Sequence, residues 1–186
     1  MNIGFALCGS FCTFSRVFPA MKALARNHSI LPVFSFAAAT VDSRFGTARE
    51  HLREAEAICG RPPVCTLAEA EPIGPRKLLD LLIVAPCTGN TLAKLSCGIA
   101  DTPVTMAVKS HLRNGRPVLI AVSTNDALGA AGENIGRLLN RRHYYFVPFR
   151  QDSPEGKPAS MVADFSRLPE AAEAALRRKQ LQPLLY

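Results

Sequence analysis

The sequence predicts a doubly wound α/β domain, in which a parallel sheet lies between two layers of helices. Short apolar runs alternate with longer amphipathic stretches, a pattern typical of βαβ units with a buried sheet. A chain of 186 residues, 48% of them hydrophobic, is also long enough to bury one sizeable core. No repeat or shift in composition marks a second domain. Residues 1–186 are therefore expected to form a single three-layer domain.

The first half of the chain contains two continuous apolar runs, each followed by an amphipathic stretch. Pro19 comes early enough in the first of these stretches to be tolerated in a helix. A Gly-Arg-Pro-Pro sequence from Gly60 stops the second helix. In chain order, the expected elements are strand 3–8, helix 13–26, strand 30–36, helix 44–59 and a short strand 64–66.

The second half repeats the alternation around two clear strands. Leu81 to Ala85 is an apolar run closed by Pro86, as expected of a central parallel strand. Residues 150–160 are polar and rich in Pro and Gly, and we expect a mobile loop there. The remaining expected elements are helices 90–97 and 104–112, strand 117–122, helix 133–141, strand 144–147 and helix 170–182.

The charge and the cysteines narrow the class of protein. Lys and Arg number 22 against 15 Asp and Glu, giving a net charge of +7. The basic residues form short clusters without a long stripe or aromatic residues spaced for base stacking, so anionic small molecules and an acidic partner are favoured over nucleic acid. The six cysteines contain no CxxC pair and no zinc-ligand spacing, so we expect packed thiols and no metal.

The amino-terminal residues and the length of the apolar runs indicate the cellular compartment of the protein. The first residues lack the basic region of a secretory signal, and no apolar run approaches the roughly 20 residues needed to cross a bilayer. A cytoplasmic protein with reduced thiols and no membrane segment is expected.

The loop after the first strand is a candidate phosphate site. Gly9 and Ser10 lead into a predicted helix, whose amino terminus presents free N–H groups, and Gly9 would let the backbone approach an anion closely. An ordinary helix cap by Ser10 or Thr13 is the alternative. Neither GxGxxG nor GxxxxGK[ST] is present, which leaves a mononucleotide such as a flavin as the natural candidate.

Two further polar loops follow predicted strands. The first is Ala85-Pro86-Cys87-Thr88-Gly89-Asn90-Thr91, and the second is Ser123-Thr124-Asn125-Asp126. Ser35, at the end of the second strand, is a weaker contributor. Each loop alone could be ordinary capping. Because strand ends converge in a doubly wound sheet, the loops together favour a ligand crevice.

The loops also carry a family resemblance. Gly9-Ser10, the loop from Ala85 to Leu95 and Gly98-Ile99-Ala100-Asp101-Thr102-Pro103 resemble the flavoprotein superfamily of flavin-dependent cysteine decarboxylases. Cys87 and Gly89 stand where the superfamily motif has alanines, so Cys87 is interpreted as a packed residue more readily than as a nucleophile. Over nearly the whole chain, the sequence is more similar to the family of bacterial dipicolinate synthase B subunits, which shares the Ala-Pro-Cys-Thr-Gly-Asn-Thr loop.

The resemblance implies a Rossmann-like or flavodoxin-like fold and a cytoplasmic oxidoreductase of the mother cell during sporulation. With an A subunit that binds NADP or NAD, it would oxidise a dihydrodipicolinate-level intermediate to dipicolinate. The superfamily also implies FMN and a homo-oligomer. The implied cofactor-binding residues are Gly9, Ser10, Ser35, Pro86, Thr88, Asn90, Thr91, Ser123, Thr124 and Asn125.

Three questions stay open from the sequence. No histidine has a catalytic spacing, so the catalytic residues are unknown. Lys94, Lys109 or Arg113 could hold a carboxylate of the dicarboxylate substrate, although each such residue is more often a solvated helix residue. The alternatives to a flavin-containing catalytic subunit are a non-catalytic binding subunit with an empty or repurposed pocket and a stand-alone flavin-dependent decarboxylase.

Overall fold

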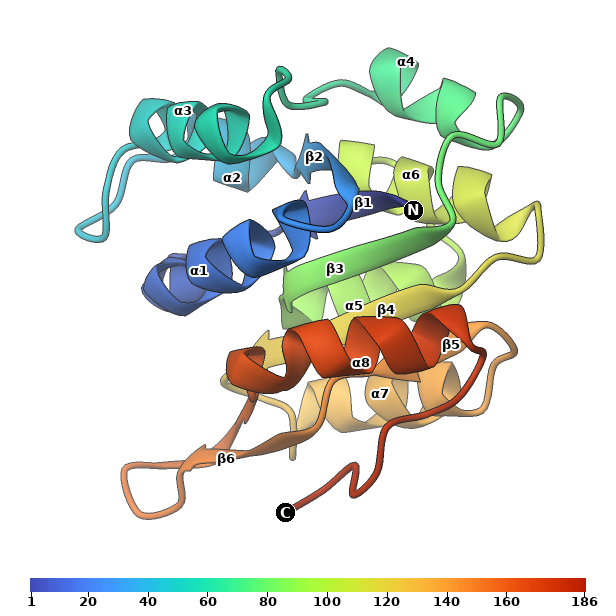
Figure 1. Ribbon diagram of the computed structural model, residues 1–186. Helices are drawn as coiled ribbons and strands as arrows, with labels where there is room; N and C mark the ends of the chain where they lie inside the picture. Colours follow the sequence, from blue (N-terminus) through green and yellow to red (C-terminus); the bar gives the residue numbers. More distant parts are fainter.

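A seven-stranded mixed sheet forms the centre of the computed structural model, which describes residues 1–186 (Figure 1). The strands are β1 (Asn2–Leu7), β2 (Ser29–Phe34), β3 (Leu81–Cys87), β4 (Val118–Thr124), β5 (Tyr144–Phe146), β6 (Phe149–Ser153) and β7 (Lys157–Ala163). The order β2-β1-β3-β4 is parallel throughout, and β5 pairs in parallel with the first half of β4. This part confirms the predicted doubly wound sheet.

Helices cover both faces of the sheet. Figure 1 shows α1 and α8 in front of it and α5, α6 and α7 behind it. The helices are α1 (Phe14–Ala25), α2 (Phe36–Thr40), α3 (Ala48–Cys59), α4 (Leu67–Ala70), α5 (Gly89–Cys97), α6 (Pro103–Leu112), α7 (Ala130–Leu139) and α8 (Leu168–Leu176). Single 3-10 turns lie at Phe11–Thr13, Glu71–Ile73 and Phe165–Arg167. No helix has the length and apolar content that crossing a membrane requires.

Burial on both faces explains why the central strands are continuous apolar runs. Every residue of β3 is buried, and so is every residue of β4 except Thr124.

The ends of α3 are set by the capping residues that flank it. Thr47 and Glu50 form a reciprocal capping box at the start of α3, and Gly60 ends that helix with φ +67°.

The main difference from the sequence expectation lies at residues 150–160. Instead of a loop, β6 and β7 form an antiparallel hairpin, and β7 pairs antiparallel with Ser123 and Thr124 at the end of β4. The polar sequence of β6 obscures its strand pattern, because its exposed residues alternate with half-buried ones on an edge hairpin. The expected mobility of this segment stays a prediction.

Two other expected elements also differ. Residues 64–66 contribute only one bridge, between Val64 and Val33. The last helix ends at Leu176, well before residue 182, because the tail turns back onto the sheet. Gln180 exchanges hydrogen bonds with the backbone of Phe146, accepting at 2.8 Å and donating at 2.7 Å. Local helix propensity could not reveal this long-range contact.

Candidate functional site

The strand order brings three of the predicted loops together. The chain leaves β1 toward β2 on one side and reaches β3 on the other, so the order reverses between β1 and β3. Ligands of doubly wound sheets bind beyond the strand ends at such a point. Ser10, after β1, and Ser123, at the end of β4, are 2.8 Å apart between their Oγ atoms. The two loops therefore meet across the end of β3.

A cavity of about 440 Å³ opens at this edge. Its size suits a small organic ligand. Six of the ten residues predicted from the sequence line it: Gly9, Ser10, Thr88, Ser123, Thr124 and Asn125. Residues of the loops after β1, β3 and β4 thus line one cavity.

The other four predicted residues lie around the cavity without lining it. Ser35 is buried and caps α2, accepting from the Ala38 N–H at 3.2 Å. Pro86 is buried in β3, and its carbonyl accepts from the Cys8 N–H at 3.3 Å. Asn90 is exposed in the first turn of α5.

Thr91 ties the second loop to the first strand. Its hydroxyl donates to Cys8 Sγ at 3.3 Å and lies 3.2 Å from the hydroxyl of Thr88, the cap of α5. Burial raises the pKa of Cys8 to about 11. Burial, together with the nearby Cys8, raises the pKa of Cys87 well above its usual value. Both thiols stay protonated at neutral pH, which supports packing over nucleophilic chemistry for Cys87.

Gly89 explains one departure from the superfamily motif. A Cβ atom at this position would lie 2.7 Å from Thr124 Oγ1 and 2.8 Å from Asp126 Oδ1. Thr124 also donates to Asp126, which fixes both side chains against the start of α5. The alanine of the motif does not fit here unless these neighbours move.

Sequence reasoning missed the charged and aromatic residues of the same cavity. Arg16 comes from α1, Arg44 and Phe45 come from the segment after α2, and Lys157 comes from the hairpin. Only the short helix α2 separates Arg44 from the parallel strand β2. Because ligands bind beyond the carboxyl ends of such strands, the sequence could have indicated Arg44 as a site residue. Lys157 could not be found, because the hairpin itself was not predicted.

The segment carrying Arg44 is anchored by a buried histidine. His51 of α3 lies 3.2 Å through Nε2 from the Phe45 carbonyl and packs edge-on to Phe14 with ring centroids 4.7 Å apart. A Cβ at Gly46, where φ is +124°, would come within 2.7 Å of His51 Nε2. Glycine is therefore required at this turn.

The cavity offers cations with free hydrogen-bonding capacity. Arg44 stacks on the Phe45 ring at 4.8 Å, and neither Arg44 nor Arg16 forms an ion pair or a side-chain hydrogen bond. Lys157, by contrast, pairs with Asp152 at 2.9 Å, and this hydrogen bond raises the pKa of Lys157. Two guanidinium groups are thus available to an anion.

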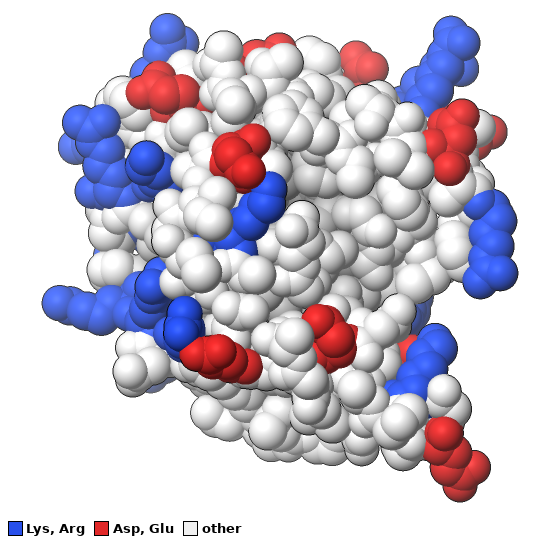
Figure 2. Space-filling view, turned by 180° about the vertical axis from the view of Figure 1, so that it is seen from behind, with Lys and Arg blue, Asp and Glu red and all other residues white.

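The lysines and arginine that the sequence offered as carboxylate ligands lie elsewhere. Lys94 is paired with Asp101 at 2.8 Å, Lys109 lines a separate small cavity, and Arg113 is the C-cap of α6. The rear face of the molecule shows no single basic band. Figure 2, the rear view, shows Lys and Arg in separate groups with acidic side chains among them.

The doubly wound sheet with a cavity at its strand ends is the fold of a nucleotide-binding class of protein, and comparison with known proteins identifies the family. The family model described as Flavoprotein matches residues 1–152, and the chain belongs to this family. Within it, the chain groups with dipicolinate synthase B subunits. That of Bacillus subtilis is 43% identical over 185 residues, covering 99% of this chain and 92% of that protein.

Comparison with solved structures leads to the same family. The crystal structure of the dipicolinate synthase B subunit from Bacillus halodurans C matches with a TM-score of 0.91 and 43% identity, over 100% of this chain and 95% of the other. The FMN-dependent cysteine decarboxylase SpaF matches with a TM-score of 0.68 and 23% identity, over 95% and 97% of the two chains. The second match shows the shared fold.

Proposed function

We propose that this protein is the B subunit of a dipicolinate synthase. With an A subunit, it would oxidise a dihydrodipicolinate-level intermediate to dipicolinate during sporulation. The observation that carries this proposal is the 43% identity to the Bacillus subtilis B subunit, which extends over 99% of the chain. The relationship thus covers the whole domain and all the loops of the candidate site.

The cavity residues fit FMN, the cofactor in the name of the related decarboxylase. A phosphate needs hydrogen-bond donors, close backbone approach and compensating charge. Ser10, Ser123 and the first N–H groups of the Phe11–Thr13 turn supply donors, and Gly9 supplies the close approach. Arg44 supplies positive charge without a competing carboxylate.

The roles of the protein residues follow from their positions. Ser10 and Ser123 would bind the cofactor across the end of β3, while the Phe11 and Phe45 side chains offer apolar surface for a ring. A bound flavin would supply hydride-transfer chemistry. The chain lacks a dinucleotide fingerprint, so NADP or NAD is assigned to the A subunit. A homo-oligomer and mother-cell localisation are parts of the same proposal.

Reconstitution tests the function. The A subunit, the dihydrodipicolinate-level substrate and the nicotinamide cofactor are combined with wild-type protein, Ser10→Ala or Asn90→Ala, and dipicolinate formation is followed. We expect formation to depend on this subunit and to fall with Ser10→Ala. Asn90→Ala tests whether a residue outside the cavity contacts the ring or the substrate. Dipicolinate formation that is unchanged without this subunit would contradict the proposal.

Flavin content separates this proposal from its alternative. A non-catalytic subunit with an empty or repurposed pocket would support A-subunit activity without binding FMN. The exposed Arg44 and the buried Ser123 line the same cavity, so their alanine variants should both weaken FMN binding if the cavity is used. Carbon dioxide release from a cysteinyl peptide would instead indicate a decarboxylase.

A further inference from the structure

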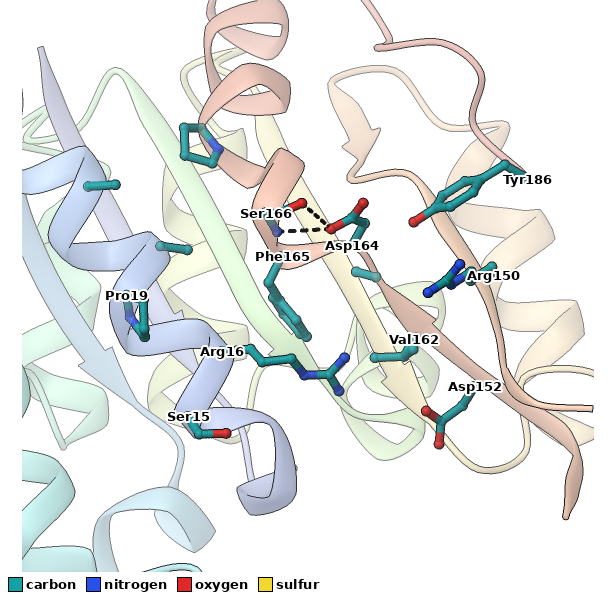
Figure 3. Close-up of a pocket in the computed structure, with 14 residues that line it drawn as sticks. Ser15, Arg16, Pro19, Arg150, Asp152, Val162, Asp164, Phe165, Ser166 and Tyr186 are labelled. Carbon is teal, nitrogen blue, oxygen red and sulfur yellow. Dashed lines mark hydrogen bonds between the residues drawn. The ribbon is translucent and has the colours of Figure 1, made fainter.

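A second cavity, of about 580 Å³, adjoins the first (Figure 3). It lies between α1, the turn at Phe165–Arg167 and the β6–β7 hairpin, and Tyr186 of the tail reaches its edge. Arg16, Asp152 and Val162 line both cavities. A ligand in the second cavity would therefore lie next to the strand-end crevice.

Two arginines face this cavity from opposite walls. Figure 3 shows the Arg16 side chain extending from α1 and the Arg150 side chain extending from β6 into the space between them. The guanidinium carbon of Arg16 lies 5.5 Å from the Phe165 ring centroid, and that of Arg150 lies 5.5 Å from the Tyr186 ring centroid. Stacking on a ring orients a guanidinium while its N–H edges stay free to bind a carboxylate.

Neither arginine forms an ion pair within the protein, but Arg150 lies close enough to Asp164 for its charge to help lower the pKa of that carboxyl. Arg16 and Arg150 are absent from every ion pair and every side-chain hydrogen bond of the structure. In contrast, Arg116, Arg137 and Arg167 each form an ion pair. Both guanidinium groups of the cavity thus lie over aromatic rings and form no direct ion pair.

The carboxylates of the cavity wall are already engaged. Asp152 pairs with Lys157 at 2.9 Å. Asp164 accepts from the Ser166 N–H at 3.0 Å and from its hydroxyl at 2.5 Å. Burial acts to raise the pKa of Asp164, but hydrogen bonds from Ser166 and Tyr186, together with the positive charge of Arg150, outweigh it and lower the pKa. Asp164 is therefore ionised at neutral pH, and both acids already have partners within the protein.

From this geometry we infer that the second cavity is a subsite for a small dicarboxylate, with Arg16 and Arg150 each binding one carboxylate. A guanidinium binds a carboxylate by paired, charge-assisted hydrogen bonds, and the cavity has the volume of a small-molecule site. The inference rests on the proposed function for the identity of the dicarboxylate. It assigns substrate contact to residues other than Lys94, Lys109 and Arg113.

Equilibrium dialysis with pyridine-2,6-dicarboxylate tests the subsite on the full chain. The matched monocarboxylate, pyridine-2-carboxylate, is measured alongside. We expect the dicarboxylate to bind at least tenfold more tightly than the monocarboxylate, and Arg150→Gln to remove this preference. Arg150→Lys, which keeps the charge but loses the paired geometry, should give an intermediate affinity.

The controls separate this inference from the proposed cofactor. Arg150 lines only the second cavity, so Arg150→Gln should leave the FMN affinity unchanged. Arg142→Gln removes the same charge from an exposed arginine that lines neither cavity and should leave both affinities unchanged. Thermal unfolding of each variant confirms folding.

Two results would overturn the subsite. One is equal dicarboxylate affinity in wild-type protein and Arg150→Gln. The other is loss of A-subunit binding in Arg150→Gln with no measurable dicarboxylate binding to wild-type protein, which would assign this surface to an acidic partner. Failure of FMN to bind would count against the proposed cofactor and would leave the dialysis result standing.

Discussion

Gly89→Ala tests the close packing at the start of α5. The added Cβ would lie 2.7 Å from Thr124 Oγ1 and 2.8 Å from Asp126 Oδ1. Asp126 can rotate away, but Thr124 is β-branched and is held by its hydrogen bond to Asp126. Thr124 also belongs to β4, which pairs with β7 at this residue, so its backbone is held as well. The side chain or the helix start must move.

The expected cost follows from two opposing terms. Forcing an extra carbon into a packed site costs about 1–3 kcal/mol, while replacing a helical glycine by alanine gains about 0.5–1 kcal/mol. Gly89→Ala should therefore lower the free energy of unfolding by up to about 2.5 kcal/mol. Gly136 in α7 has no atom within 4 Å of its Cβ position, so Gly136→Ala should raise that free energy by about 0.5–1 kcal/mol.

Urea unfolding of the two variants makes the comparison direct. Both change a helical glycine to alanine, Gly89 at the first position of α5 and Gly136 inside α7, and only at Gly89 does the new atom meet neighbours at 2.7 and 2.8 Å. In a Thr124→Ala/Asp126→Ala background, Gly89→Ala should lose most of its cost, because the obstructing atoms are gone. A Gly89→Ala protein as stable as Gly136→Ala would refute the steric argument.

Three further predictions concern the hydroxyl pair, a buried histidine and the thiols. Alanine variants of Ser10 and Ser123, alone and combined, should show a coupling of about 0.5–1.5 kcal/mol in urea unfolding, since their hydroxyls are hydrogen-bonded at 2.8 Å; additive effects would contradict this pairing. Burial lowers the pKa of His111 to about 4, so the unfolded chain binds more protons between pH 6.5 and 4 and stability falls as pH drops through that range, by about 3 kcal/mol. His111→Gln should lose that much less between pH 7 and 4 in the same unfolding measurement, and equal losses would rule out the linkage. In a timed reaction with a thiol reagent, the exposed Cys12 should react quickly and the buried Cys87 slowly; rapid modification of Cys87, or loss of dipicolinate formation in Cys87→Ala, would argue against a packed thiol.

The sequence was sufficient for the parallel part of the fold, because burial on both faces leaves a continuous apolar signature. Val118–Thr124 and Leu81–Cys87 are such runs, and both are strands. The β6–β7 hairpin was missed because Arg150, Gln151 and Asp152 present no apolar pattern. The turn of the tail back toward Phe146 depends on Gln180, a contact that spans 34 positions and has no local signal.

The residues of the candidate site likewise fall into two groups, those that local sequence patterns predict and those that only the tertiary structure reveals. Gly9, Ser10, Thr88 and Ser123 could be predicted because each follows a recognisable parallel strand, and strand ends converge. Charged residues from elsewhere, such as Arg150 on the missed hairpin, required the tertiary structure. Local patterns therefore identified the backbone of the crevice, whereas the cations around it depend on long-range packing.

Titration of the purified protein with FMN, followed by flavin fluorescence, tests the central claim that the strand-end crevice binds this cofactor. We predict saturable binding of one FMN per chain to wild-type protein, and at least tenfold weaker binding to the Ser10→Ala/Ser123→Ala double variant. Absence of binding to the folded wild-type protein, or equal affinity in the double variant, would contradict it.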